Sequence, residues 1–196
     1  MSSVLPGELA WYVTGRFYAQ ASKALADYGY FLHLGTIAAP LFDGEPGEAT
    51  AHFTFAAQPF EARSISNGAL SLALDPVGSF AVYFQAEPRG NFDDPASFAL
   101  GQCIARFRRS SVVVGTTVNS SAAAAAQALV ASNVFSARLI DSEPFQFRGR
   151  HYDLREMLGQ GVTQFGTAAT APVEPALENY TAVIPFSGSA LALGPG

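Results

Sequence analysis

The chain of 196 residues is short of charge, because Lys, Arg, Asp and Glu together make up 14% of it, against about 25% in ordinary soluble domains. Of the eleven basic residues one is a lysine, Lys23, and the formal net charge is −5. Binding to nucleic acid requires a concentration of positive charge, so the composition disfavours a nucleic-acid partner. Hydrophobic residues reach 49%, which provides enough apolar surface for a folded core and disfavours disorder.

A single cysteine, Cys103, rules out an internal disulfide and a zinc site built on several cysteines. We expect it to be a buried, unreactive thiol in a strand. The first residues lack a basic stretch followed by an apolar one, and no run of about eighteen apolar residues occurs. These two absences predict a cytoplasmic protein without a membrane span.

Motifs of the large enzyme classes are also missing. The chain has no Gly-x-Gly-x-x-Gly, no phosphate-binding loop, no His-Glu-x-x-His and no Gly-x-Ser-x-Gly. Its three histidines, His33, His52 and His151, are far apart in sequence, which gives no support to a metal site. We therefore predict neither a metal nor a cofactor, and whether the protein is an enzyme stays open.

Aromatic residues, by contrast, are plentiful, with sixteen Phe and seven Tyr, and they favour pleated, half-buried surfaces. Residues 9–20 alternate between an apolar and a polar face, which predicts a strand. Residues 28–37 are apolar on both faces and predict a strand covered on both sides. Residues 48–56 alternate again, with Phe53 and Phe55 opposite His52.

Turn signals predict how these strands connect. Asn67-Gly68 suits a tight hairpin turn between flanking strands, and Asp75-Pro76-Val77-Gly78 predicts a second reversal, which would give a meander of three strands. Further along, the alanine-rich residues 122–131 predict a helix. A second, short helix is predicted to begin at Asp153, because Asp153 and Glu156 have the spacing of a capping box.

Together these patterns predict one domain over residues 1–196. It is mainly β, an antiparallel β-barrel or a sandwich, with one or two helices in the C-terminal half. The strand count and the small residues within strands, such as Gly15, Gly35 and Gly101, resemble the architecture of calycin-type and allene-oxide-cyclase-type barrels. That resemblance implies a fold and leaves the function open.

The function that these features favour is a small-molecule-binding β-barrel with an aromatic-lined apolar cavity. The predicted ligand contacts are Tyr12, Phe53, Tyr83 and Arg106, of which Arg106 could receive a carboxylate or a phosphate. An apolar small molecule is the expected partner. Solid packing of small against large side chains in the core would be the alternative to a cavity.

Two further functions remain open. A cofactor-free isomerase, cyclase or lyase could act in the barrel lumen with His33 or His52 and a tyrosine as acid–base groups, since imidazole titrates near neutral pH. His33 is otherwise a hydrogen-bonded core histidine, and His52 is otherwise exposed to solvent. The second is a structural or assembly module that forms a homo-oligomer through strand edges or an aromatic patch.

Overall fold

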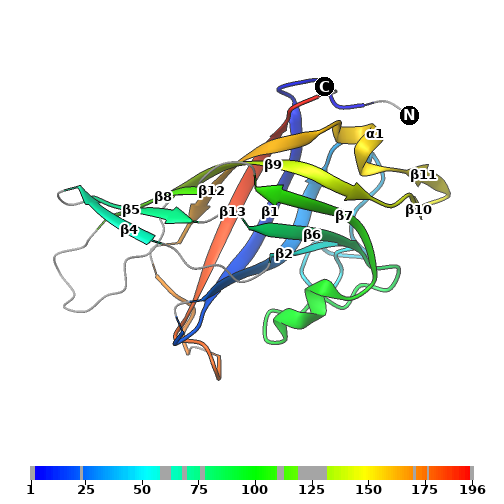
Figure 1. Ribbon diagram of the computed structural model, residues 1–196. Helices are drawn as coiled ribbons and strands as arrows, with labels where there is room; N and C mark the ends of the chain where they lie inside the picture. Colours follow the sequence, from blue (N-terminus) through cyan, green and yellow to red (C-terminus); the bar gives the residue numbers. More distant parts are fainter. Residues whose placement is uncertain are drawn as a thin grey trace.

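The computed structural model describes residues 3–22, 24–57, 63–67, 70–75, 78–109, 113–118, 132–169, 171–175 and 177–194 (Figure 1). Eight strands form a barrel, namely β1 (Leu9–Ala19), β2 (Leu25–Leu34), β3 (Phe53–Ala57), β6 (Ser79–Phe84), β7 (Gln102–Arg109), β9 (Ser132–Ser142), β12 (Gly161–Ala168) and β13 (Ala182–Ala192). Three strands extend it, β4 (Arg63–Asn67), β5 (Leu70–Asp75) and β8 (Val113–Val118). A separate hairpin comprises β10 (Phe145–Phe147) and β11 (Arg150–Tyr152), and the helices are the 3-10 helix η1 (Pro95–Ala99) and α1 (Leu154–Leu158).

The sheet closes into a barrel because the two strands at the ends of its spatial order, β12 and β9, pair with each other. Its strands follow one another in the order β12, β13, β1, β2, β3, β6, β7 and β9, and β9 pairs back onto β12. Neighbouring strands are antiparallel throughout. The predicted mainly β, antiparallel barrel is therefore confirmed, and the architecture is not a sandwich.

Beyond one end of the barrel, β4, β5 and β8 form a three-stranded extension that we call the arm (Figure 1). The arm continues β3, β6 and β7, because β5 pairs with β8 as β6 pairs with β7. The pairs of β3 with β6, such as Phe53 with Phe84, and those of β4 with β5, such as Asn67 with Leu70, have the same register. The segments 53–67 and 70–84 thus form a single long hairpin.

The predicted reversal at residues 75–78 is wrong. β5 and β6 run in the same direction and do not pair, since β6 lies between β3 and β7. A proline lacks the N–H that a strand ladder needs, so Pro76 suits an interruption of a strand as well as a turn. The hairpin predicted at Asn67-Gly68 is present as the pairing of β4 with β5. Asn67 itself ends β4 and pairs with Leu70, while Gly68 lies outside the described part of the chain.

One end of the barrel, which we call the closed end, is covered by the β10–β11 hairpin and α1 (Figure 1). Phe53 is completely buried, and its ring lies 5.6 Å from that of Phe145 and 5.1 Å from that of Phe147. The helix contributes three buried side chains, and the backbone O of Met157 accepts a hydrogen bond from Val4 N at 2.9 Å. Aromatic and aliphatic packing therefore seals this end.

The short helix α1 begins as the sequence predicts. The Asp153 side chain accepts a hydrogen bond from Arg155 N at 2.8 Å, which satisfies one of the free N–H groups of the first turn. α1 is the one α-helix among the described residues and lies in the C-terminal half. The helix predicted at residues 122–131 lies outside the described residues.

β1 and β2 approach closely at a pair of glycines, Gly15 and Gly29. A Cβ atom on Gly15 would lie 2.4 Å from Tyr28 O, and one on Gly29 would lie 2.1 Å from Thr14 O. Gly15 also leaves room for the rings of Phe55 and Phe186. The small residue that the sequence places among large ones is therefore required by packing inside the barrel.

Candidate functional site

A cavity occupies the barrel interior at the end opposite α1, which we call the open end because its mouth meets solvent. The space between its lining side chains, mouth included, is about 480 Å³, of which about 40 Å³ can be reached by the centre of a water molecule. That space is enough for a few water molecules. The lining is mainly aromatic and consists of Trp11, Val13, Phe17, Asp27, Phe31, Phe55, Phe80, Arg109, Asn133, Phe135, Gln164, Gly166 and Phe186.

Two opposite charges, Asp27 on β2 and Arg109 on β7, lie in this lining. Their side chains are buried, and Arg109 Nη2 lies 3.7 Å from Asp27 Oδ2. Asp27 Oδ1 has no hydrogen-bond partner among the described residues. The Arg109 guanidinium also lies over the ring of Phe135, with its carbon 4.8 Å from the ring centre.

Burial raises the pKa of Asp27 above its ordinary value, and the positive charge of Arg109 opposes that rise without cancelling it. The carboxyl therefore takes up a proton at higher pH than an exposed aspartate does. A carboxyl group with such a shift in a cavity is a recognised mark of a functional site, although structural ion pairs show it too.

Two amide side chains complete the polar part of the lining. Gln164 on β12 accepts a hydrogen bond from the indole Nε1 of Trp11 at 2.8 Å through Oε1. Asn133 on β9 has a buried Oδ1 without a partner among the described residues. Asp27 Oδ1 and Asn133 Oδ1 are thus two buried acceptors without a hydrogen-bond donor among the described residues. Buried polar atoms without a partner are rare in folded proteins.

These residues could bind a small molecule with an apolar body and a polar head, or move a proton. The aromatic side chains would pack on the body, while Asp27, Arg109 and Asn133 would receive the head. A carboxyl group beside an arginine can also take a proton from carbon while the arginine stabilises the negative charge that develops.

His33 lies on the outside of the barrel, where it is exposed. The register between β1 and β2 shifts at this point, so that Tyr12 faces His33 while Val13 faces Phe31. The extra residue, Leu32, is a β-bulge, which turns two successive side chains outward. The expectation that His33 is a core residue is therefore wrong, and Tyr12, paired with it and 40% exposed, also faces outward.

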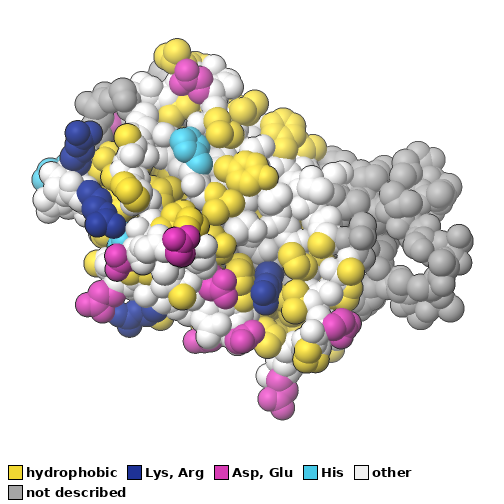
Figure 2. All heavy atoms as spheres, turned by 180° about the vertical axis from the view of Figure 1, so that it is seen from behind, with side chains coloured by type: hydrophobic (Ala, Val, Ile, Leu, Met, Phe, Trp, Pro, Cys, Tyr) yellow, Lys and Arg dark blue, Asp and Glu magenta, His cyan; other side chains and the backbone are white. Residues whose placement is uncertain are grey.

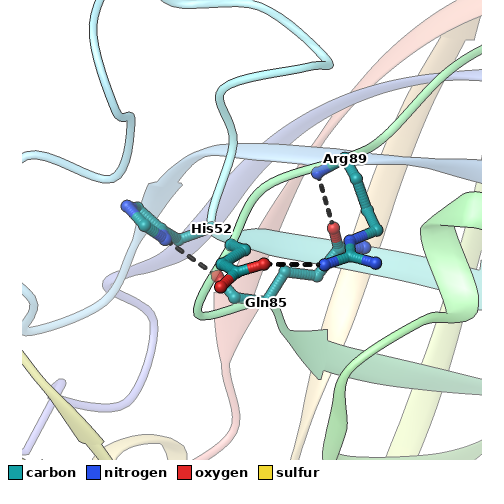
Figure 3. Close-up of polar contacts among 4 residues, drawn as sticks. His52, Gln85 and Arg89 are labelled. Atoms are coloured by element: carbon teal, nitrogen blue, oxygen red, sulfur yellow. Dashed lines mark hydrogen bonds and ion pairs between the residues drawn. The ribbon is translucent and has the colours of Figure 1, made fainter.

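His52 is buried rather than exposed, and it lies outside the cavity lining. Its Nδ1 lies 2.8 Å from the backbone O of Gln85 (Figure 3), which can only accept, so Nδ1 carries the proton. Gln85 in turn binds Thr54 Oγ1 and Ser97 O through Nε2 and accepts from Arg89 N. This network holds the segment 85–99 against β3, which is a structural role.

The remaining predicted ligand contacts lie in two other places. Phe53 belongs to the aromatic packing of the closed end. Tyr83 and Arg106 share a groove on the outside of the barrel, with Tyr28 also in its lining; the space between the lining side chains, mouth included, is about 630 Å³, of which about 230 Å³ can be reached by the centre of a water molecule. The structure therefore brings Tyr83 and Arg106 together, away from the lumen.

Asp27, Asn133 and Gln164 were missed by the sequence analysis. A usable signal exists for both buried charges, since Asp27 continues the inward face of Gly29 and Phe31, and Arg109 that of Ala105 and Phe107. A charged residue at an inward position of an apolar face marks a buried charge.

No family model matches this chain, and neither the curated proteins nor the solved structures yield a significant match. Within the described ranges, no three His, Cys, Asp or Glu side chains gather as a metal site would require. In the same part of the chain, none of the helices has the length and hydrophobicity to cross a membrane. Fold and site alone therefore define the class, a closed eight-stranded antiparallel barrel with an aromatic cavity and a buried ion pair.

Proposed function

We propose that the protein binds an apolar small molecule at the open end of its barrel. The observation that carries this proposal is the cavity, in which seven aromatic side chains surround buried polar groups that lack partners. A ligand would pack on the rings and supply the missing hydrogen bonds. Because the enclosed part is small, a single ring fits more readily than a fused ring system.

Trp11 offers a direct test of binding, since it is the only tryptophan and lines the cavity. Benzene titrated into the protein should change Trp11 fluorescence in a saturable way. Gly166→Leu would place a side chain in the cavity lining and should abolish the change. Gly47→Leu is the matched control, because a Cβ at Gly47 meets nothing closer than 3.9 Å. An equal saturable response in all three proteins would refute binding in this cavity.

The alternative is a cofactor-free isomerase, cyclase or lyase in the same lumen. Since neither His33 nor His52 lines the cavity, we assign the acid–base role to Asp27, whose raised pKa supports it. A nitrobenzisoxazole is a suitable probe, because a carboxylate that takes its ring C–H proton breaks the N–O bond and releases a coloured cyanophenolate. Turnover should be lost in Asp27→Asn and kept in Asp93→Asn, an exposed site. Equal rates would exclude Asp27 as the base.

We also propose that two copies associate through the outer face of β12, β13 and β1. β12 and β13 contain no charged residue, and one row across the sheet carries Val134, Phe165 and Tyr12, each at least 36% exposed. With β9, which carries Val134, the four strands that this row crosses measure roughly 35 Å by 19 Å, somewhat less than the about 800 Å² that each partner buries in a standard interface. Figure 2 shows hydrophobic side chains gathered on the back of the molecule.

Light scattering tests this association. A dimer should become a monomer in Phe165→Glu, because the new carboxylate would lose its hydration when buried beside the apolar side chains of its row. Leu100→Glu, at an equally exposed position after η1, should leave the dimer intact. A wild-type monomer at high concentration would refute the proposal.

A further inference from the structure

The polar groups of the lumen restrict which kind of head group a ligand can present. Asp27 Oδ1 and Asn133 Oδ1 are acceptors, and both are buried without a partner among the described residues. A ligand that satisfies them must donate hydrogen bonds. Ethers, ketones and hydrocarbons donate none, so they would leave both oxygens as they are.

The spacing of the ion pair adds a second restriction. Arg109 Nη2 and Asp27 Oδ2 are 3.7 Å apart, whereas a direct hydrogen bond spans about 2.7–3.2 Å. An oxygen atom that bears a hydrogen can lie beside this pair and contact both groups, because it donates to the carboxylate and accepts from the guanidinium. A hydroxyl group does so with one atom, and its single O–H serves Asp27 and leaves Asn133 to a second donor.

Charge restricts the head group further. A carboxylate ligand would be attracted by Arg109 and repelled by Asp27, and an ammonium ligand would be attracted by Asp27 and repelled by Arg109. In a buried site these opposing interactions are strong, and an ion would also lose its hydration. A neutral head group avoids both costs.

We propose that the lumen selects neutral hydroxyl compounds with an aromatic body, the phenols and aryl alcohols, whose O–H donates to Asp27 while its oxygen accepts from Arg109. The aromatic body would pack among Phe31, Phe55 and Phe135, which line the same cavity. This inference rests on the proposed binding function, and it names the class of ligand.

Four single-ring compounds test the inference on the wild-type protein. Phenol has a donor and an acceptor, anisole has the acceptor alone, benzene has neither, and benzoate carries a negative charge. Their dissociation constants can be measured by calorimetry at several pH values, because Asp27 accepts a hydrogen bond as a carboxylate and its pKa is raised. We expect phenol to bind at least about tenfold more tightly than anisole, in keeping with a hydrogen bond to a charged group.

Three other binding results would each contradict the inference or the binding function. If anisole and phenol have equal dissociation constants, the O–H donor does not contribute to binding, and the inference fails while the binding function stands. If benzoate binds most tightly, the site is an anion site and the inference fails again. If none of the four binds, the proposed function itself fails and the inference falls with it.

A pair of variants locates the effect. Asp27→Asn removes the charge with little change of shape and should reduce the preference for phenol over anisole to about threefold or less, as expected for a neutral hydrogen bond. Asp93→Asn makes the same chemical change at an exposed position and should keep the full preference. An unchanged preference in Asp27→Asn would refute the assignment, and if that variant does not fold, the four-compound series still decides.

Discussion

The two ends of the barrel are filled by different chemistry. At the closed end, the rings of Phe53, Phe145 and Phe147 pack together under α1 and the β10–β11 hairpin. At the open end, Asp27 and Arg109 are buried among equally aromatic surroundings. Burying charges lowers stability unless they are fully paired, and Asp27 is not. The packing at the closed end therefore stabilises the fold, whereas the buried Asp27 carboxyl at the open end does not, in keeping with the binding function proposed above.

The largest effect should come from the closed end. Phe53→Ala removes a fully buried ring and should lower the free energy of unfolding by about 3–5 kcal/mol, as measured by urea denaturation. Benzene binding by the folded protein should be unchanged, because Phe53 does not line the cavity. Leu100→Ala, at a 47% exposed side chain outside the proposed interface, should stay within about 0.5 kcal/mol of wild type. A loss of benzene binding in Phe53→Ala would mean that the two ends are coupled.

A smaller decrease in the free energy of unfolding is expected when the Asp27–Arg109 ion pair is broken. Arg109→Met leaves Asp27 as a buried charge and should cost about 3 kcal/mol at neutral pH, again by urea denaturation. The double variant Arg109→Met with Asp27→Asn should recover most of the lost stability, because neither buried charge of the pair then remains. If the double variant is as unstable as the single one, Arg109 stabilises the barrel by packing on Phe135 rather than by charge.

Gly188→Ala should have a still smaller effect, confined to the open end. A Cβ there would lie 2.3 Å from Gln164 Nε2, so the Gln164 side chain must move and its hydrogen bond to Trp11 weakens. We expect a loss of about 1–2 kcal/mol together with a shift of the Trp11 emission. Gly47→Ala should change neither. An unshifted emission would show that the Gln164 amide can move while keeping the bond.

The smallest effect is a dependence on pH. The raised pKa of Asp27 means that the folded state holds its proton at pH values where the unfolded chain has lost it. Asp27 therefore contributes stability below its unfolded pKa of 3.8, and that contribution is lost as the pH rises through the folded pKa. The stability of Asp27→Asn relative to wild type should rise over this range. A constant difference between the two proteins would contradict the raised pKa.

Much of the barrel could be predicted from local patterns, and its departures from them have physical causes. The alternation in β1 is direct, with Trp11, Val13 and Phe17 buried as expected. The bulge at Leu32 reverses the face of His33, because a shift of one residue exchanges the two faces of a strand. No local pattern in the chain signals that shift.

The arm and the site could not be predicted for a related reason. Whether the chain turns or continues at residues 75–78 depends on the partners of β5 and β6, which lie on β8 and β7. Likewise, Asp27 and Arg109 meet because β2 and β7 lie across the lumen from each other, and their 82-residue separation in sequence conceals this. Both outcomes depend on long-range register, which one sequence does not reveal.

The long hairpin of residues 53–84 has a consequence for the order of folding. Its pairs begin next to the turn, at Asn67 and Leu70, and proceed outward to Phe53 and Phe84, so each new pair closes a loop only slightly longer than the one before. The pairing of β1 with β13, which the barrel also needs, instead joins Leu9 to Leu191, residues far apart in the sequence. Contacts of such different sequence separation form at different rates. The hairpin should therefore form first and align β3 and β6, and the pairing of β1 with β13 should be the slow step that creates the lumen.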